Sequence, residues 1–200
     1  MDASELADQI KEMKKENAAS EVRERWVAVY ISILAVLLAL TSLGGSNAAK
    51  DTLTNAIAAS DAHNFFQAKN IRQTMYKMGV EELEAELASG KYPPETQDKL
   101  RALADKYKST VQRYESEPET GEGKKELLAK AKELEAARNL GQQKDPYFDL
   151  AEAGLQIAVV LASVSLVTEI AALLWFSMVL ASGAFILMIG GFTLLFPMPF

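Results

Sequence analysis

Charged and uncharged residues separate into long blocks along the chain. Residues 26–44 carry no charged side chain and residues 153–200 carry only Glu169, whereas nearly all the other charges lie in 1–25 and 45–152. Such separation is typical of a membrane protein with a polar middle and not of a simple soluble domain. The pattern predicts an all-α membrane protein. We expect three transmembrane helices, with a long antiparallel, coiled-coil-like helical hairpin between the first and the second.

The first predicted transmembrane helix is 26–44. A helix of this length rises about 28 Å, which is close to the hydrocarbon thickness of a bilayer. Trp26 and Tyr30 suit the membrane interface. The alternative is a cleavable signal peptide, but the apolar run is too long and the 25 residues before it include seven acids. The sequence therefore favours an uncleaved anchor that follows a charged N-terminal segment, 1–25.

A second apolar block, 154–196, is too long for one crossing. As a single helix it would extend about 64 Å, twice the hydrocarbon thickness. We therefore predict two transmembrane helices, 147–167 and 172–196. The first is expected to begin at Asp145–Pro146, with Asp as the N-cap and Pro in the first helical position.

The turn between these two helices is expected at 168–171. This placement leaves Glu169, the only charge of the block, at the membrane surface, because a charge inside the bilayer is costly. A turn at 175–177 is the alternative. It would bury Glu169 and make it a functional acid, for instance in a pore.

The polar middle, 45–146, reads as three helices separated by Gly and Pro. They are predicted at 46–88, 95–116 and 124–142, and the first of them can continue from the first transmembrane helix. Apolar residues recur three or four positions apart along each of these helices, which favours antiparallel packing of the first against the other two. Pairing with another chain would produce the same stripes. The residues expected in this seam are Leu53, Ile57, Ile71, Met75, Met78, Val80 and Leu83, facing Leu100, Leu103, Tyr107, Val111, Tyr114, Leu127, Ala131 and Leu134.

Lys and Arg near the crossings predict the orientation. Five precede the first crossing and only Lys50 follows it closely, whereas three precede the second crossing. The balance places the N-terminus in the cytoplasm and 45–146 on the opposite side of the membrane.

Composition excludes several kinds of chemistry. The chain has no Cys, one His and a net charge of −6, which argues against thiol chemistry and against nucleic acid as a partner. No phosphate-binding loop, dinucleotide motif or zinc motif is present. We predict no catalytic, cofactor-binding or metal residues, and no enzyme activity.

Two sets of residues are candidates for contacts. Small residues that allow close helix packing, within one bundle or between subunits, are Ala35, Ala39, Gly154, Ala158 and Ala162. A polar stretch of the predicted helix 46–88 lies opposite the loop 117–123, which separates the other two predicted helices. This loop is expected to cover Asn64 and Gln67. This stretch either fixes the register of the hairpin or docks a protein partner, and its residues are Ser60, Asp61, His63, Asn64, Phe65, Phe66 and Gln67.

Several segments resemble a bacterial family, domain of unknown function 4337. They include FQAKNIRQ at 66–73, GKKELL at 123–128, DPYFD at 145–149 and LQIAVVLAS at 155–163. The resemblance covers nearly the whole chain from Trp26 and implies a small membrane protein with one crossing, a polar helical region and a C-terminal pair of crossings. It implies no activity and therefore no catalytic residue.

The expected function is that of a structural or interaction protein that displays a helical hairpin and self-associates. Its partners would be the lipid bilayer, further copies of the chain and a protein that the sequence does not identify. The alternative function is that of a subunit of an oligomeric channel or transporter.

Overall fold

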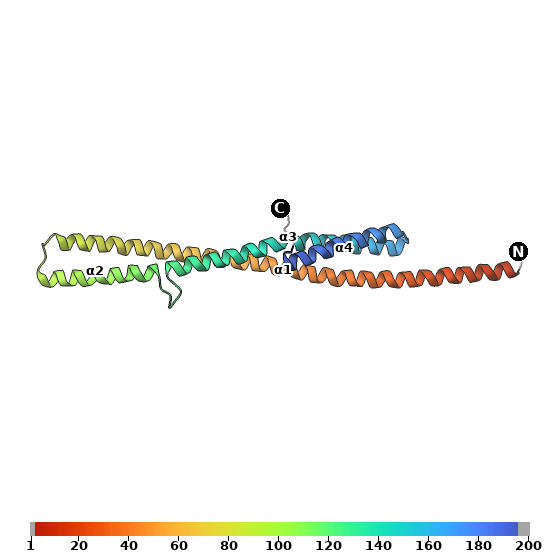
Figure 1. The fold of residues 1–200 in the computed structure, drawn as a ribbon, viewed down its shortest axis with the longest axis horizontal. Coiled ribbons are helices and arrows are strands. Elements are labelled where there is room, and N and C mark those ends of the chain that lie inside the picture. Colours follow the sequence, from red (N-terminus) through yellow and green to blue (C-terminus); the bar gives the residue numbers. More distant parts are fainter. Residues whose placement is uncertain (1–2, 196–200) are drawn as a thin grey trace. The chain divides into compact units, whose positions relative to one another are not determined.

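The computed structural model describes the backbone of residues 3–195 and the side chains of Met13 and residues 21–195. All secondary structure in these residues is helical (Figure 1). There are four helices: α1 (Ala3–Ala88), α2 (Pro94–Glu115), α3 (Lys124–Thr168) and α4 (Ala171–Thr193). The last residue of the predicted helix 172–196 lies outside the described residues. Among the described residues, α1 from Glu21, α3 and α4 are long and apolar enough to cross a membrane.

Gly, Pro and one left-handed residue mark the breaks between the helices. Gly90 has a φ of 65° after α1, and Pro94 opens α2 without needing a backbone donor. The segment 116–123 separates α2 from α3. Between α3 and α4, Glu169 has a φ of 58°, so the reversal falls within the turn expected at 168–171.

The charged segment 1–25 is helical from Ala3 onward and continues into the first predicted transmembrane helix as part of α1. One predicted boundary is wrong. A helix start was expected at Asp145–Pro146, but Pro146 lies inside α3. An internal proline removes one helical hydrogen bond. Here the next two residues, Tyr147 and Phe148, are buried, and their packing holds the helix through the proline.

The chain divides into two compact units, one formed by 1–50 and 141–200 and the other by 51–140. In the first unit, α1, α3 and α4 share a core of Leu34, Leu155, Ala158, Ala181 and Ala184. Small side chains bring the helices close together: a Cβ on Gly154 would lie 3.0 Å from the Cβ of Ala184. The hydroxyl of Ser177 donates to the carbonyl of Ala158 at 2.7 Å and lies 3.1 Å from the Tyr30 hydroxyl.

In the second unit, α1 contacts both α2 and α3. The Tyr76 and Tyr107 rings meet edge to face with centroids 5.0 Å apart, and Lys108 forms an ion pair with Glu84 at 2.7 Å. Further along, His63 bonds Glu135 at 2.9 Å. The buried and half-buried positions of these helices follow one another in alternating steps of three and four residues. We call this set of positions the inner seam. On α1 these positions are Ala59, Ala62, Phe66, Lys69, Gln73, Tyr76, Val80 and Leu83.

The apolar seam predicted on α1 is wrong for most of its members. Val80 and Leu83 are half-buried as expected. The other five are at least 55% exposed: Leu53, Ile57, Ile71, Met75 and Met78. The seam predicted on the other helices is nearly right, since Tyr107, Val111 and Leu127 are half-buried or buried. The exception is Leu103, which is exposed while its neighbour Ala104 is 3% exposed. Because α1 packs closely against α2 and α3, its buried positions are occupied by alanine or by polar residues with hydrogen-bond partners, and not by the large apolar residues that were expected there.

Candidate functional site

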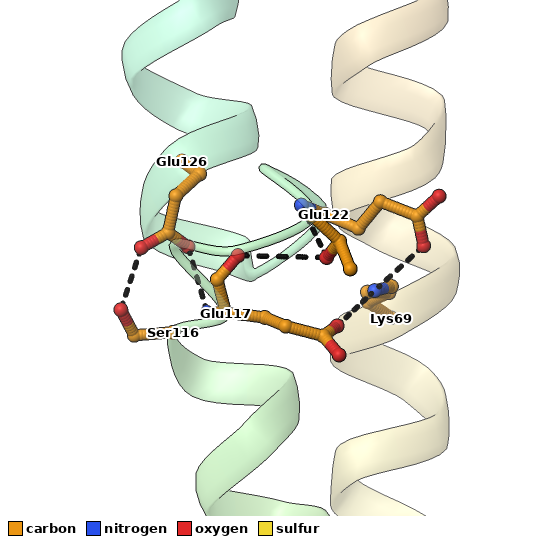
Figure 2. Close-up of polar contacts among 6 residues, drawn as sticks. Lys69, Ser116, Glu117, Glu122 and Glu126 are labelled. Atoms are coloured by element: carbon orange, nitrogen blue, oxygen red, sulfur yellow. Dashed lines mark hydrogen bonds and ion pairs between the residues drawn. The ribbon is translucent and has the colours of Figure 1, made fainter.

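A buried lysine is the most unusual feature of the second unit. The Lys69 side chain is only 6% exposed, although it lies in the middle of a long polar helix. Its ammonium lies 3.6 Å from a carboxylate oxygen of Glu117 and 3.4 Å from one of Glu122 (Figure 2). The rings of Phe65 and Tyr114 lie within 5.5 Å of it and add cation–π attraction. A lysine can be buried here because the loop between α2 and α3 supplies both counter-charges.

One turn further along α1, Gln73 is also buried and uses both ends of its amide. Its nitrogen donates to the carbonyl of Val111 at 2.9 Å and to Glu115 at 3.0 Å. Its oxygen accepts from the ammonium of Lys124 at 2.8 Å, and the same ammonium lies 3.4 Å from Glu115. Gln73 thereby connects the last turn of α2 to the first residue of α3.

Glu126 bonds the first residues of the loop between α2 and α3 directly. Its carboxylate accepts from the Ser116 hydroxyl at 2.5 Å and from the Glu117 backbone N–H at 3.2 Å (Figure 2). This approach leaves no room at Gly123, where an added Cβ would lie 2.7 Å from the Cα of Ser116. We refer to the whole set as the Lys69 network: Lys69, Gln73, Glu115, Ser116, Glu117, Glu122, Lys124 and Glu126.

The hydrogen bonds of the network perturb two carboxyl groups. The bond from Gln73, and then the ammonium of Lys124, lower the pKa of the Glu115 carboxyl below its ordinary value. The bond from Ser116 is the main cause that lowers the pKa of Glu126. Both groups therefore act as charged acceptors at neutral pH.

The arrangement is suited to holding a loop. Every polar end of Lys69, Gln73 and Glu126 named above meets a partner within the chain, so none is directed at an empty binding cavity. Within the described residues, no three His, Asp or Glu side chains gather as metal ligands would. The network joins α2 and α3 to α1 at the loop 116–123, where the helical structure between α2 and α3 is interrupted.

The predicted interaction residues are spread over different surroundings. Three of them line a groove of about 610 Å³ between α1 and α3, together with Leu127 and Lys130: Asp61, Asn64 and Phe65. His63 bonds Glu135, and the ring of Phe66 lies 5.7 Å from the Lys124 ammonium. Ser60 and Gln67 are exposed. The loop does not cover Asn64 and Gln67 as expected, because its carboxylates are paired with Lys69 instead.

The predicted packing residues also separate into two groups. Gly154, Ala158 and Ala162 are buried within the first unit, where Gly154 faces Ala184. Ala35 and Ala39 are exposed on α1. Glu169 is exposed in the turn between α3 and α4.

Sequence reasoning missed Lys69 and Gln73 because it took the apolar residues of α1 as the seam. One signal was available. The segments 66–73 and 123–128, which carry the family resemblance, contain Lys69, Gln73, Lys124 and Glu126. The structure brings these two segments together in one network.

Comparison with known proteins gives one match. The model of the family described as domain of unknown function (DUF4337) matches residues 23–194. No curated protein and no solved structure matches the chain. The family match includes the three membrane-length helices from residue 23, both arms of the second unit and the whole Lys69 network. It covers well over half of the sequence, and the chain therefore belongs to the DUF4337 family.

Proposed function

We propose that the protein is an integral membrane protein whose three apolar helical segments cross the bilayer. Residues 45–146 then lie on one side, because they connect two crossings. The Lys and Arg distribution of the sequence favours a cytoplasmic N-terminus. The resemblance to a bacterial family implies that the membrane is a bacterial inner (cell) membrane.

Between the crossings, we propose that α1 forms an antiparallel, coiled-coil-like hairpin with α2 and α3. The order of the contacts supports this arrangement. Glu84 meets Lys108, Gln73 meets Val111 and His63 meets Glu135, so residue numbers fall on α1 as they rise on α2 and α3. The three-and-four spacing of the inner seam supports heptad packing.

We propose that this hairpin serves as an interaction surface through which the protein self-associates. The observation that carries the proposal is the inverted distribution of side chains on α1. The interior of the hairpin takes small or polar residues such as Ala59, Ala62 and Gln73, whereas Ile57, Ile71 and other large apolar residues face outward. A solvated helix has no need of such a face, and large exposed apolar patches mark binding surfaces.

The test is the mass of the full chain in lipid nanodiscs and in mild detergent. Self-association predicts particles that contain at least two chains of 21.9 kDa at micromolar concentration. A particle with one chain at every concentration would eliminate self-association. An oligomer that also conducts ions in liposomes would favour the alternative function, a channel subunit, for which Glu169 is the acid to substitute.

A further inference from the structure

The outward apolar residues of α1 repeat with the same seven-residue period as the inner seam, but on another face of the helix. Ile57, Asn64, Ile71 and Met78 are spaced by seven residues, and all four are exposed. Leu53 and Met75 lie beside them on the same face. We call these six residues the outer stripe, and its five apolar members are 55–67% exposed.

The heptad residues of the outer stripe lie on the far side of α1 from the inner seam, where Asn64 also borders the open groove between α1 and α3. Each of its heptad residues precedes an inner-seam residue by two positions, as Ile57 precedes Ala59 and Ile71 precedes Gln73. Two residues correspond to about 200° of rotation around a helix. A second helix could therefore pack on the outer stripe without displacing α2 or α3.

We propose that the outer stripe binds the outer stripe of a second copy of the chain, with the two α1 helices parallel and in register. This inference rests on the proposed self-association and adds the face and the direction of the contact. The direction follows from the membrane, because copies inserted with the same orientation present their α1 helices in the same sense. A parallel pair places each heptad position against itself.

Asn64 is a polar interruption of the kind that fixes such a register. In a parallel pair, Asn64 meets Asn64 of the second copy, where the two amides can bond each other. A shifted pair would place an amide against Ile57 or Ile71 and leave it without a partner. A single polar Asn at this type of position specifies register and oligomer state in coiled coils, at a cost in stability. The positions between the heptad residues, Ser60, Gln67 and Thr74, are also polar and exposed, so the apolar contact is confined to the outer stripe itself.

The charges beside the stripe are complementary for the same arrangement. In parallel coiled coils, a residue on one flank faces the residue five positions later on the partner. Lys77 and Glu82 have this spacing, both are exposed, and neither forms an ion pair among the residues that the structure describes. One heptad before Ile57, Lys50 would meet Lys50 of the second copy, so the contact ends before Lys50 on that side.

The exposed apolar area is sufficient for a modest dimer. Five large side chains that are more than half exposed offer on the order of 400–500 Å² per copy, or roughly 1,000 Å² in the pair before flanking residues are added. Specific interfaces begin at about this size. The two membrane units also hold the copies in one plane, which raises their effective concentration.

Disulfide cross-linking in lipid tests the proposal, because the natural chain has no Cys. We would introduce Ile57→Cys, Asn64→Cys or Ile71→Cys singly into the full chain and oxidise the protein in nanodiscs. Each variant is expected to form a cross-linked dimer. Arg72→Cys is the matched control, since it is one residue from Ile71 but about 100° around the helix. It is expected to give at least tenfold less dimer.

The outcomes separate this inference from the proposed function. A wild-type mass of one chain per particle would remove self-association and the stripe contact together. An oligomeric mass without cross-links at the three stripe positions would overturn the stripe contact and leave self-association standing. Efficient cross-linking between Leu53→Cys on one copy and Met78→Cys on the other would overturn the parallel direction.

Discussion

Gly44 provides the sharpest test of how the helices of the first unit pack. It lies inside α1, where an added Cβ would be 2.5 Å from Cε1 and 2.8 Å from Cζ of Phe148. The neighbours of the Phe148 ring leave it little room to move away from an added methyl group. It is 2% exposed, it meets the Phe192 ring edge to face at 4.9 Å, and it lies about 3.0 Å from where a Cβ on Gly191 would be.

The size of the effect of Gly44→Ala can be worked out from these contacts. Forcing a methyl group into a filled core costs about 1–3 kcal/mol, because side chains and backbone must shift. Replacing glycine by alanine within a helix returns about 0.5–1 kcal/mol. The difference is a net loss of up to about 2.5 kcal/mol in the free energy of unfolding, and the 2.5 Å approach to a buried ring favours the upper half of this range. Gly183→Ala is the matched control, since nothing lies within 4 Å of its added Cβ, and it should be neutral or slightly stabilising.

The assay is reversible unfolding of the full chain in mixed micelles, followed by loss of helical circular dichroism. A third variant, Phe148→Leu, identifies the clashing group. Combined with Gly44→Ala, it should cost about 1 kcal/mol less than the sum of the two single changes, because the smaller side chain relieves the clash. Strict additivity, or equal effects of Gly44→Ala and Gly183→Ala, would refute the reasoning.

Three further predictions concern the loop, pH and topology. Lys69→Met should lower the free energy of unfolding by about 1–2 kcal/mol, because removing one partner of an ion pair leaves the other charges unpaired. The loss stays moderate because Glu117 is 23% and Glu122 is 55% exposed, so water can solvate both carboxylates. Amide exchange in the α2–α3 loop should also become faster, and an unchanged exchange rate would contradict the anchoring role. Since the pKa of Glu115 is lowered, its contribution to stability is complete above the ordinary value of 4.5 and is lost as pH falls through the lowered value. The melting temperature should therefore drop less in acid for Glu115→Gln than for the wild type, and parallel curves would count against this. Single cysteines at Ser20 and Ser89 should react with impermeant reagents from opposite faces of the membrane, and labelling of both from one face would reject the topology.

The places where the helices break could be read from the sequence, because they depend on local chemistry. Gly90 supplies a left-handed residue, and Pro94 is restricted to the first turn of a helix. The length of the apolar block beginning at residue 154 requires a reversal, and its only charge marks the turn. Local chemistry was misleading at Pro146, where the buried side chains of Tyr147 and Phe148 hold the helix together.

The buried face of α1 could not be read in the same way. Two stripes with heptad spacing run along this helix, and the more apolar one faces outward. The inner seam is built from Ala59, Ala62, Lys69 and Gln73, whose burial depends on what α2, α3 and their loop bring to them. Hydrophobicity ranks a lysine last among buried residues unless its partners are known. Those partners lie 48 to 53 residues away along the chain for Lys69.

The spacing around the loop explains why the network lies at the break. The last half-buried seam position of α2 is Tyr114, and the first of α3 is Lys124. These two positions are ten residues apart, and ten residues equal one step of three plus one full heptad. The loop thus takes the place of helical turns, and the heptad spacing of the seam residues continues from α2 into α3. Because the loop cannot supply side chains at helical spacing, the opposing positions on α1 need partners of another kind. Glu117 and Glu122 provide charge for Lys69, while Glu115 and Lys124 satisfy Gln73, so an interruption that would leave a void is closed by ion pairs and hydrogen bonds.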